Sequence, residues 1–258
     1  MLDLKTIQTF YADQLKDGYK KSMLREYLQY KILKILFESK YATKMSFLGG
    51  TALRIVHQNS RFSEDLDFDN FKLSEEEFEE LSLIIKRGLE LEGCIVEVKT
   101  IFKNAYHCNI RLPEILYNSD LTPMRNEKIS ILVDTLAHEF DYIPDKIILN
   151  QFDVFTTILS TPIDILLSQK FYAVFNRKTA KGRDFYDIIF LLSKTKPNMD
   201  YISFKLNIQT LKELKSEILK KCETLDFKAL SRDVQPFLFN PSDTRVAQFV
   251  EYFKNVEW

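Results

Sequence analysis

The sequence has little glycine, proline, cysteine and histidine. Its 258 residues include six glycines and seven prolines, fewer than half the number expected from average usage, in which the two types together make up about 12% of residues. This shortage argues against fibrous and disordered chains and predicts long regular elements. The three cysteines form no Cys-x-x-Cys pair, which argues against a disulfide framework or structural zinc site and favours a reducing cytoplasm. The three histidines show no spacing typical of a zinc site or a Ser-His-Asp triad.

An excess of charge of one sign and long apolar runs are also absent. The 36 Lys and Arg and 37 Asp and Glu leave a net charge of −1, so a nucleic-acid surface would have to be a local patch. No stretch approaches the roughly 18 apolar residues of a membrane span, and we expect no signal peptide because the N-terminal segment lacks an apolar core. A chain of 258 residues that is 45% hydrophobic fits one large domain or two modest ones.

The hydrophobic pattern changes along the chain. It predicts helices over residues 20–39, 75–92, 162–177 and 183–194, and strands over 45–48, 64–69, 94–102, 106–112 and 128–134. Ser74 and Glu77 have the spacing of a capping box, and residues 137–145 form an irregular segment. We therefore predict an α/β (α+β) fold, with a mixed-sheet domain over residues 1–160 and a mainly helical C-terminal domain over residues 161–258.

The strongest motif is the run FLGGTALRIVHQNSRFSEDLDFD, residues 47–69. Gly49 and Gly50 would let the backbone approach a triphosphate, and Thr51 adds a hydroxyl at the start of a helix. Asp65 and Asp67 follow on a strand, where period-two alternation places them on one face. Two carboxylates so close repel each other unless a cation such as Mg²⁺ lies between them and the nucleotide phosphates.

Other charged residues in this run have two interpretations. Arg54 and Arg61 are candidates for binding the triphosphate or the substrate, and the alternative for each is a surface ion pair. Asp69 continues the alternation of the strand and would simply be solvated.

The run resembles the opening motif of the nucleotidyltransferase toxins of the abortive-infection AbiEii/AbiGii family, which belong to the polymerase-β-like superfamily. The resemblance covers residues 20–195. It implies that the glycine turn and the two aspartates hold an NTP and its metal, and that a later Lys and an Arg-Asp-x-x-Asp helix complete the active site. Lys170 and the stretch KGRDFYD, residues 181–187, match these later elements.

Lys170 lies in the middle of an apolar helix, where its charge is costly to bury without an anion. A phosphate is one partner, and a Lys side chain that reaches solvent is the alternative. By the resemblance, Asp184 is catalytic or orients Lys170 or the acceptor, and Tyr186 and Asp187 are supporting positions. Capping of the helix would also explain both aspartates.

A basic stripe follows Lys170. Arg177, Lys178, Lys181 and Arg183 occur with no acid between them and are interleaved with aromatic residues, which suits an RNA backbone and its unpaired bases. The alternative is a solvated basic face over a core that contains Phe171 and Phe175.

The third carboxylate of polymerase-β-like enzymes has only a weak candidate. Asp134 lies at the C-terminal end of its predicted strand, and Ser130 occupies the place where an acid is expected. A single Mg²⁺ with another group activating the attacking hydroxyl therefore fits as well as two metals. His138 is a further candidate for a substrate contact.

These observations predict a cytoplasmic, Mg²⁺-dependent nucleotidyltransferase that transfers NMP from an NTP to an RNA acceptor. The resemblance implies a toxin of a toxin–antitoxin or phage-defence pair, a cognate antitoxin protein, and the 3′ end of tRNA as the acceptor. Transfer to a small molecule or a protein is the alternative within enzymes. A noncatalytic NTP-binding interaction protein is the alternative of another class.

Overall fold

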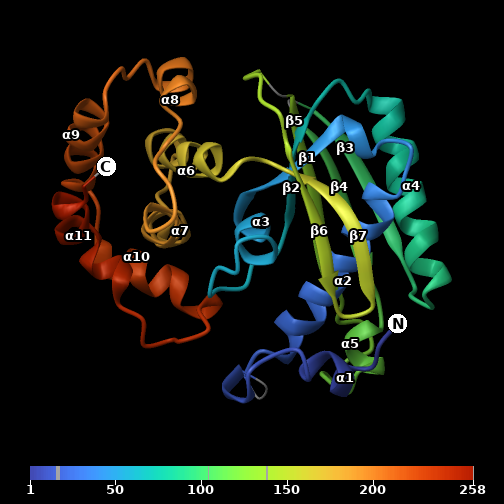
Figure 1. Cartoon of the computed structure of the whole chain (residues 1–258). Coiled ribbons are helices and arrows are strands. Elements are labelled where there is room, and N and C mark those ends of the chain that lie inside the picture. Colours follow the sequence, from blue (N-terminus) through green and yellow to red (C-terminus); the bar gives the residue numbers. More distant parts are fainter. Residues whose placement is uncertain (16–17, 104, 138, 258) are drawn as a thin grey trace. The chain divides into compact units, whose positions relative to one another are not determined.

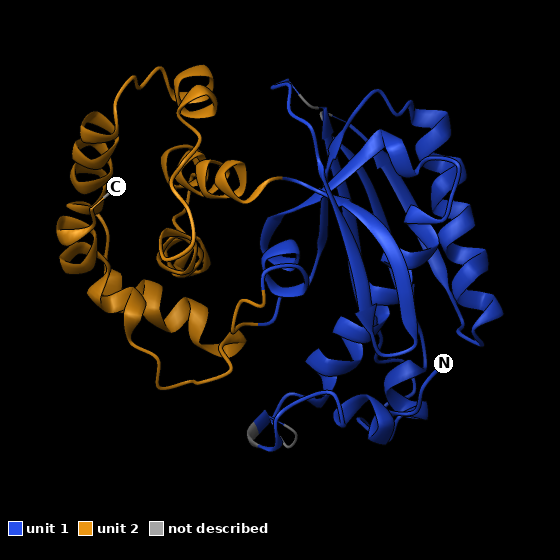
Figure 2. Cartoon of the chain, viewed as in Figure 1, with its two compact units in different colours: residues 1–57, 62–161 blue, residues 58–61, 162–258 orange. Residues whose placement is uncertain are grey.

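The computed structural model describes residues 1–15, 18–103, 105–137 and 139–257. The chain forms two compact units (Figures 1 and 2). The first contains residues 1–57 and 62–161, and the second contains residues 58–61 and 162–258. The second unit therefore takes four residues, Gln58–Arg61, from a loop that the chain passes through long before the rest of that unit. None of the helices in the described ranges is long and apolar enough to cross a membrane.

The first unit is built on a mixed sheet with the strand order β3-β4-β5-β2-β1-β7-β6. The strands are β1 (Met45–Leu48), β2 (Leu66–Asn70), β3 (Glu97–Phe102), β4 (Tyr106–Leu112), β5 (Ile129–Ala137), β6 (Asp145–Gln151) and β7 (Val154–Ser160). β1 runs antiparallel to β2 and parallel to β7, and β2 runs parallel to β5. The pairs β3–β4, β4–β5 and β6–β7 are antiparallel. The strands on either side of the glycine turn, β1 and β2, thus lie at the centre of the sheet.

One face of this sheet is covered by α2 (Lys20–Phe37) and α4 (Glu75–Leu91), which pack on strands β3, β4, β5 and β7 (Figure 1). In β5, Ile131 and Val133 are fully buried on one face, whereas Ser130 and Asp134 on the other face are exposed or half-buried. This alternation separates an apolar core from a polar face that carries the candidate site. The unit also contains α1 (Leu4–Gln8), α3 (Gly49–Ile55), α5 (Ile115–Asn118) and the 3-10 turns η1 (Asp13–Leu15) and η2 (Ala42–Lys44).

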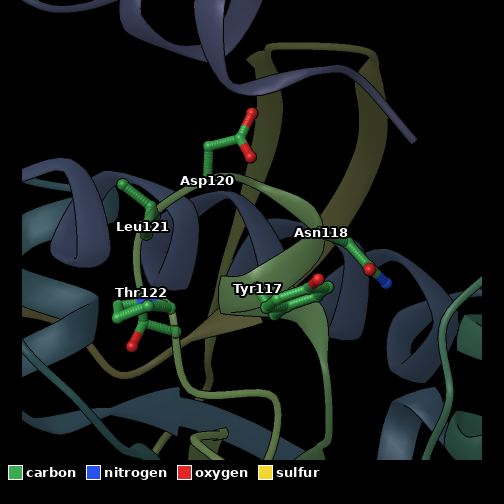
Figure 3. Close-up of a pocket in the computed structure, with 6 residues that line it drawn as sticks. Tyr117, Asn118, Asp120, Leu121 and Thr122 are labelled. Carbon is green, nitrogen blue, oxygen red and sulfur yellow. The ribbon is translucent and has the colours of Figure 1, made fainter.

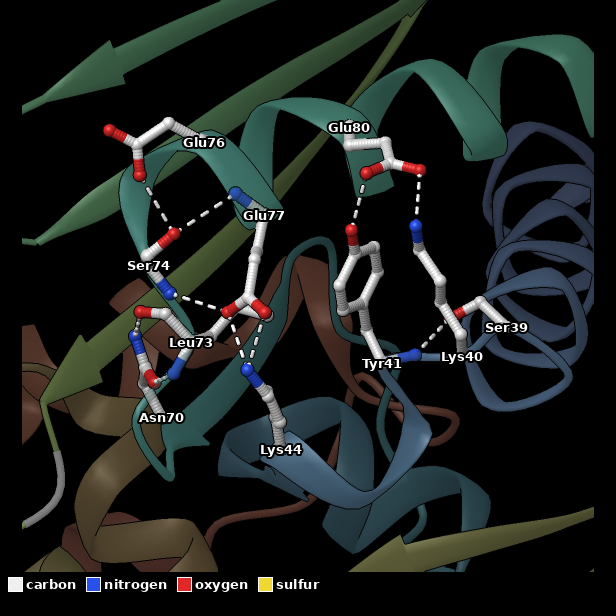
Figure 4. Close-up of polar contacts among 10 residues, drawn as sticks. All are labelled: Ser39, Lys40, Tyr41, Lys44, Asn70, Leu73, Ser74, Glu76, Glu77 and Glu80. Atoms are coloured by element: carbon white, nitrogen blue, oxygen red, sulfur yellow. Dashed lines mark hydrogen bonds and ion pairs between the residues drawn. The ribbon is translucent and has the colours of Figure 1, made fainter.

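Polar contacts attach α4 to the segment that leads into β1 (Figure 4). The capping box predicted at Ser74 and Glu77 is confirmed. Glu77 also pairs with Lys44 at 2.5 Å, and the Tyr41 hydroxyl donates to Glu80 at 2.5 Å. Since β1 begins directly after Lys44, these contacts fix the start of the central strand.

The second unit is helical. It contains α6 (Ile163–Asn176), α7 (Gly182–Leu192), α8 (Met199–Leu206), α9 (Leu211–Cys222), α10 (Phe227–Val234), α11 (Phe249–Asn255), η3 (Gln235–Phe237) and η4 (Arg245–Gln248). Helix α7 packs against α6 and α10. Gly182 permits the contact with α10 because a Cβ at this position would collide with the carbonyl oxygen of Leu230.

Several predicted element bounds differ from the structure; for example, the strand predicted from residue 94 begins at Glu97. The helix predicted to open at Thr51 begins at Gly49, and the strand predicted from residue 64 begins at Leu66. The sequence analysis also missed the hairpin of β6 and β7, which follows the predicted irregular segment. Its turn places Phe152 at φ 56° without the Asn-Gly or Asp-Gly pair that usually marks a two-residue hairpin turn.

Candidate active site

The glycine turn brings the backbone against a carboxylate. Leu48, at the end of β1, pairs in register with Asp67 in β2. The next residue, Gly49, has a φ of 80°, and a Cβ on it would collide with the Asp67 carboxylate. Both the positive φ and the close approach require glycine at this position. The hydroxyl of Thr51 donates to the backbone carbonyl of Asp65, which ties the start of α3 to the residue before β2.

Several carboxylates lie on the polar side of the sheet. Asp69 in β2 is only 8% exposed and accepts a hydrogen bond from the Tyr142 hydroxyl at 2.6 Å, so it is buried and not solvated as expected from sequence. Asp65 is exposed just before β2, Asp67 is half-buried inside it, and Asp134 pairs with Asp67 in register on the parallel strand β5. The prediction that Asp134 ends its strand is wrong, because β5 continues to Ala137. The neighbouring strand β4 contributes His107, whose Nδ1 lies 2.6 Å from Asp134 Oδ1.

The donor chemistry of this site suits Mg²⁺. Within the described residues, no three His, Cys, Asp or Glu side chains are grouped so as to hold a metal ion. Mg²⁺, however, is usually bound through one or two carboxylates together with substrate phosphates rather than by a protein cage. Asp65 and Asp67 supply two such hard oxygen ligands, and the backbone of Gly49 lies against the second of them.

Arg54 is held in an ion pair inside the first unit. Its Nε and Nη2 lie 2.9 Å and 3.0 Å from the two carboxylate oxygens of Glu26 in α2. The Tyr11 hydroxyl donates to the same carboxylate at 3.0 Å. Glu26 is only 4% exposed, so this is a buried bidentate pair and not the surface pair considered from sequence. It joins α3 to α2.

A buried ionic cluster forms the centre of the second unit, around Asp187 in α7. Arg61 donates to Asp187 through Nε at 2.7 Å and Nη2 at 2.6 Å, and Asn59 Nδ2 donates at 2.8 Å. Lys170 Nζ in α6 lies 2.8 Å from Asp187 and 3.3 Å from Asp184. Arg61 is 1% exposed and Asp187 fully buried, so the surface ion pair considered for Arg61 is replaced by a buried one. The anions that Lys170 meets within its own unit are therefore these two aspartates.

The cluster fixes the ionisation of its members. Burial raises the pKa of Asp187, but Arg61 and Lys170 oppose burial and hold that pKa below its usual value. Burial lowers the pKa of Lys170, and the two aspartates more than reverse this effect, so its pKa is raised. Asp187 is therefore an anion and Lys170 a cation at neutral pH.

Arg177 adds a third cation, because its Nε lies 2.8 Å from Asp184. The group thus contains three cations, Arg61, Lys170 and Arg177, and two carboxylates. A net positive charge in a partly buried place favours an anionic ligand such as a phosphate.

Comparison with known proteins decides the family. Residues 31–249 match the family described as "Nucleotidyl transferase AbiEii toxin, Type IV TA system". The chain belongs to this AbiEii family. The resemblance inferred from the glycine and aspartate motif is confirmed, and the chain is a nucleotidyltransferase, which removes the noncatalytic alternative. AbiEii membership also implies an NTP substrate and an antitoxin partner.

Solved structures agree with the AbiEii fold. The nucleotidyltransferase toxin MenT4 from Mycobacterium tuberculosis has a TM-score of 0.62 at 14% identity, and the match covers 100% of this chain and 91% of that one. JHP933 from Helicobacter pylori has a TM-score of 0.58 at 17% identity, with coverage of 92% and 91%. A putative nucleotidyltransferase from H. pylori has a TM-score of 0.57 at 18% identity, with coverage of 92% and 98%. No curated protein matches the chain. The predicted α/β fold is confirmed.

Several residues of the basic stripe in this AbiEii protein contact other side chains of the second unit, which the sequence did not indicate. Lys178 is exposed, Lys181 lies 4.0 Å from Asp233, and the guanidinium of Arg183 lies 4.8 Å from the ring centre of Phe237. Phe171 is fully buried and belongs to the core. Arg177 is exposed as well but pairs with Asp184, whereas Lys178 is exposed and forms no ion pair within the described residues.

The structure describes only one of the two minor candidates from the sequence analysis, Tyr186 and His138. Tyr186 is 2% exposed, and its hydroxyl accepts from Arg245 Nη2 at 2.6 Å, so it supports α7 from within the second unit. His138 lies outside the described residues. Sequence reasoning missed Asn59, although it lies within the run of residues 47–69, and it missed His107. Each of these residues finds its partner only through the fold.

A cavity of about 530 Å³ lies elsewhere in the first unit (Figure 3). It is lined by Tyr117, Asn118, Asp120, Leu121, Thr122 and Pro123, which belong to α5 and the loop before β5. Its lining contains one carboxylate and no basic group, so it lacks the chemistry that a triphosphate needs. The cavity is therefore not assigned to the AbiEii active site.

Proposed function

We propose that this AbiEii toxin transfers an NMP group from an NTP, with Mg²⁺, to the 3′ end of tRNA. The observation that carries the proposal is the contact between the backbone of Gly49 and the carboxylate of Asp67. A glycine turn against a carboxylate on a central strand supports binding of a phosphate chain together with its cation.

Asp65 and Asp67 would hold the metal ion. When bound, Mg²⁺ neutralises charge on the phosphates and on the leaving pyrophosphate. Gly49 and Gly50 present backbone without side chains to the triphosphate, whereas Thr51 acts through its hydrogen bond to Asp65 and fixes the turn. These roles consist of positioning and electrostatic stabilisation.

Lys170 would bind a phosphate of the nucleotide. Its ammonium group is held by Asp184 and Asp187, and the cluster carries one more cation than carboxylates. Asp184 is then a positioning residue for Lys170, as the resemblance implies. Arg54 has a different role from the one expected, since its guanidinium is already bound to Glu26, and we assign it to the support of α3.

The tRNA acceptor is the part of the proposal that rests on the AbiEii resemblance. The exposed Lys178 and the neighbouring Arg177 support it, because basic groups bind the RNA backbone without needing a particular sequence. The acceptor hydroxyl attacks the α-phosphate, and pyrophosphate leaves.

The test uses purified protein, Mg²⁺, each of the four α-labelled NTPs and total tRNA. We expect label on the tRNA 3′ end with the wild type and none with the Asp65→Ala/Asp67→Ala variant. Asp145→Ala, which removes an exposed carboxylate from the same unit, should retain full activity. Label that does not depend on Asp65 and Asp67 would contradict the assignment of the site.

The choice of acceptor is tested separately. Lys178→Ala should weaken binding and labelling of tRNA, most clearly at low salt, and should make both less dependent on salt, because each lost phosphate contact lowers the affinity and its salt dependence. Lys146→Ala, at an exposed position in β6, is the matched control. Transfer to a small molecule or a protein in place of tRNA would identify the alternative acceptor while leaving the nucleotide site as proposed.

A further inference from the structure

The side chain of His107 binds a carboxylate beside the proposed metal-binding pair. His107 in β4 pairs in register with Asp134 in β5, and Asp134 pairs in register with Asp67 in β2. Register partners in neighbouring strands point to the same face of a sheet, so the three side chains form a row. The distance of 2.6 Å joins His107 Nδ1 to Asp134 Oδ1. Because an ionised carboxylate only accepts hydrogen bonds, we assign the hydrogen to Nδ1.

This contact fixes one oxygen of Asp134. Within the described residues, the other oxygen, Oδ2, makes no hydrogen bond or ion pair with the protein. The side chains of His107 and Asp134 are 34% and 28% exposed, so the pair is accessible from solvent. Adjacent strands lie about 4.8 Å apart, and the carboxylates of Asp67 and Asp134 therefore repel each other. The bond to His107 holds Asp134 against that repulsion.

We propose that His107 is a positioning residue, which holds Asp134 as the proton acceptor of the transfer step. The inference rests on the proposed function. Asp134 Oδ2 takes the proton of the acceptor hydroxyl as the hydroxyl oxygen forms its bond to the α-phosphorus. The bond from the α-phosphorus to the bridging oxygen breaks, and pyrophosphate leaves with the electron pair.

The matched variants are His107→Asn and His107→Gln. The amide nitrogen of Asn, like Nδ1 of His, is attached to Cγ and can donate to Asp134, whereas the amide nitrogen of Gln lies one bond further out. We expect His107→Asn to retain most of the wild-type kcat and His107→Gln to lose about 10- to 100-fold in kcat, with the KM for NTP nearly unchanged. Equal kcat values for the two variants, or a loss expressed in the KM for NTP, would overturn the inference.

A double-mutant cycle tests whether His107 acts through Asp134. Asp134→Asn should lower kcat by about 100-fold or more, the range for loss of a general base. Adding His107→Gln to it should cause no further loss, because the group that His107 positions is already gone. Independent, multiplicative losses would indicate a structural role for His107. Thermal unfolding of each variant identifies any loss that is due to misfolding, and His107→Asn keeps the test valid in that case.

The two possible failures are distinct. A wild-type protein that labels no RNA with any NTP overturns the proposed function and this inference with it. A wild-type protein that labels RNA, together with a His107→Gln variant of unchanged kcat, overturns the inference alone.

Discussion

At the scale of the residue, Gly49 is required both for its backbone conformation and for the space beside it. Gly93 separates the two requirements, because it has a φ of 90° but nothing within 4 Å of an added Cβ. Gly49→Ala should therefore lose about 100-fold or more in nucleotidyl transfer, since a displaced Asp67 carboxylate would no longer be placed to bind the metal ion. Gly93→Ala should cost only about 1 kcal/mol of unfolding free energy, from its positive φ.

Both variants are compared by denaturant unfolding and by the labelling assay. The same loss of activity in Gly93→Ala would show that backbone strain, and not the contact with Asp67, accounts for the effect.

Asp187 makes stability depend on pH in acid. Its pKa is lower in the folded chain than in the unfolded chain, so the unfolded chain binds more protons between the two values. The stabilisation is complete above the unfolded pKa of about 3.9 and is lost as the pH falls through the folded pKa. Asp187→Asn should remove this acid slope and, at pH 7, lower the free energy of unfolding by about 3–5 kcal/mol, because Arg61 stays buried without its carboxylate.

Denaturant unfolding between pH 2 and pH 7 measures the slope, and Asp145→Asn makes the same chemical change at an exposed position. An Asp187→Asn variant with the wild-type slope would show that other carboxylates cause the acid sensitivity.

At the scale of the element, the ion pair between Arg54 and Glu26 joins α3 to α2. Because α3 begins at Gly49, this pair also holds the glycine turn in place. Arg54→Met should lower the free energy of unfolding by about 3–5 kcal/mol, because it leaves Glu26 charged and buried. Arg54→Met/Glu26→Gln should recover much of this loss, since Gln is neutral and still accepts from the Tyr11 hydroxyl.

The double variant also tests the role first expected for Arg54. With stability recovered, its KM for NTP should equal that of the wild type if Arg54 only supports α3. A KM that stays raised in the stable double variant would return Arg54 to the nucleotide site.

The local parts of the site could be predicted from the sequence because they depend on few neighbouring residues. The glycine turn at Gly49 and the shared face of Asp65 and Asp67 follow from short stretches of sequence, and the Ser74 capping box spans four residues. The contact of Gly49 with Asp67 does not, because it depends on the register of β1 against β2. The pairing of Asp187 with Arg61 joins positions 126 residues apart, and neither residue type indicates the other. Likewise, the row of His107, Asp134 and Asp67 depends on strand order and register, which alternation within one strand does not determine.

At the scale of the whole molecule, the boundary between the units does not follow the order of the chain. Residues 58–61 belong to the helical unit, so a fragment of residues 162–258 lacks Arg61 and Asn59. Asp187 then keeps only Lys170 as a direct partner from the cluster. Loss of the bidentate partner should cost about 3–5 kcal/mol, a large fraction of the 5–15 kcal/mol that stabilises an ordinary domain.

Asp187→Leu should have opposite effects on stability in the fragment and in the full chain. In the full chain it leaves the buried Arg61 without its carboxylate partner and should lower the denaturation midpoint. In the fragment it removes a carboxylate that has lost its guanidinium and should raise the midpoint. Urea unfolding followed by circular dichroism measures both midpoints. A lower midpoint in both would mean that Lys170 alone satisfies Asp187 and that the helical unit does not depend on the segment from residue 58 to residue 61.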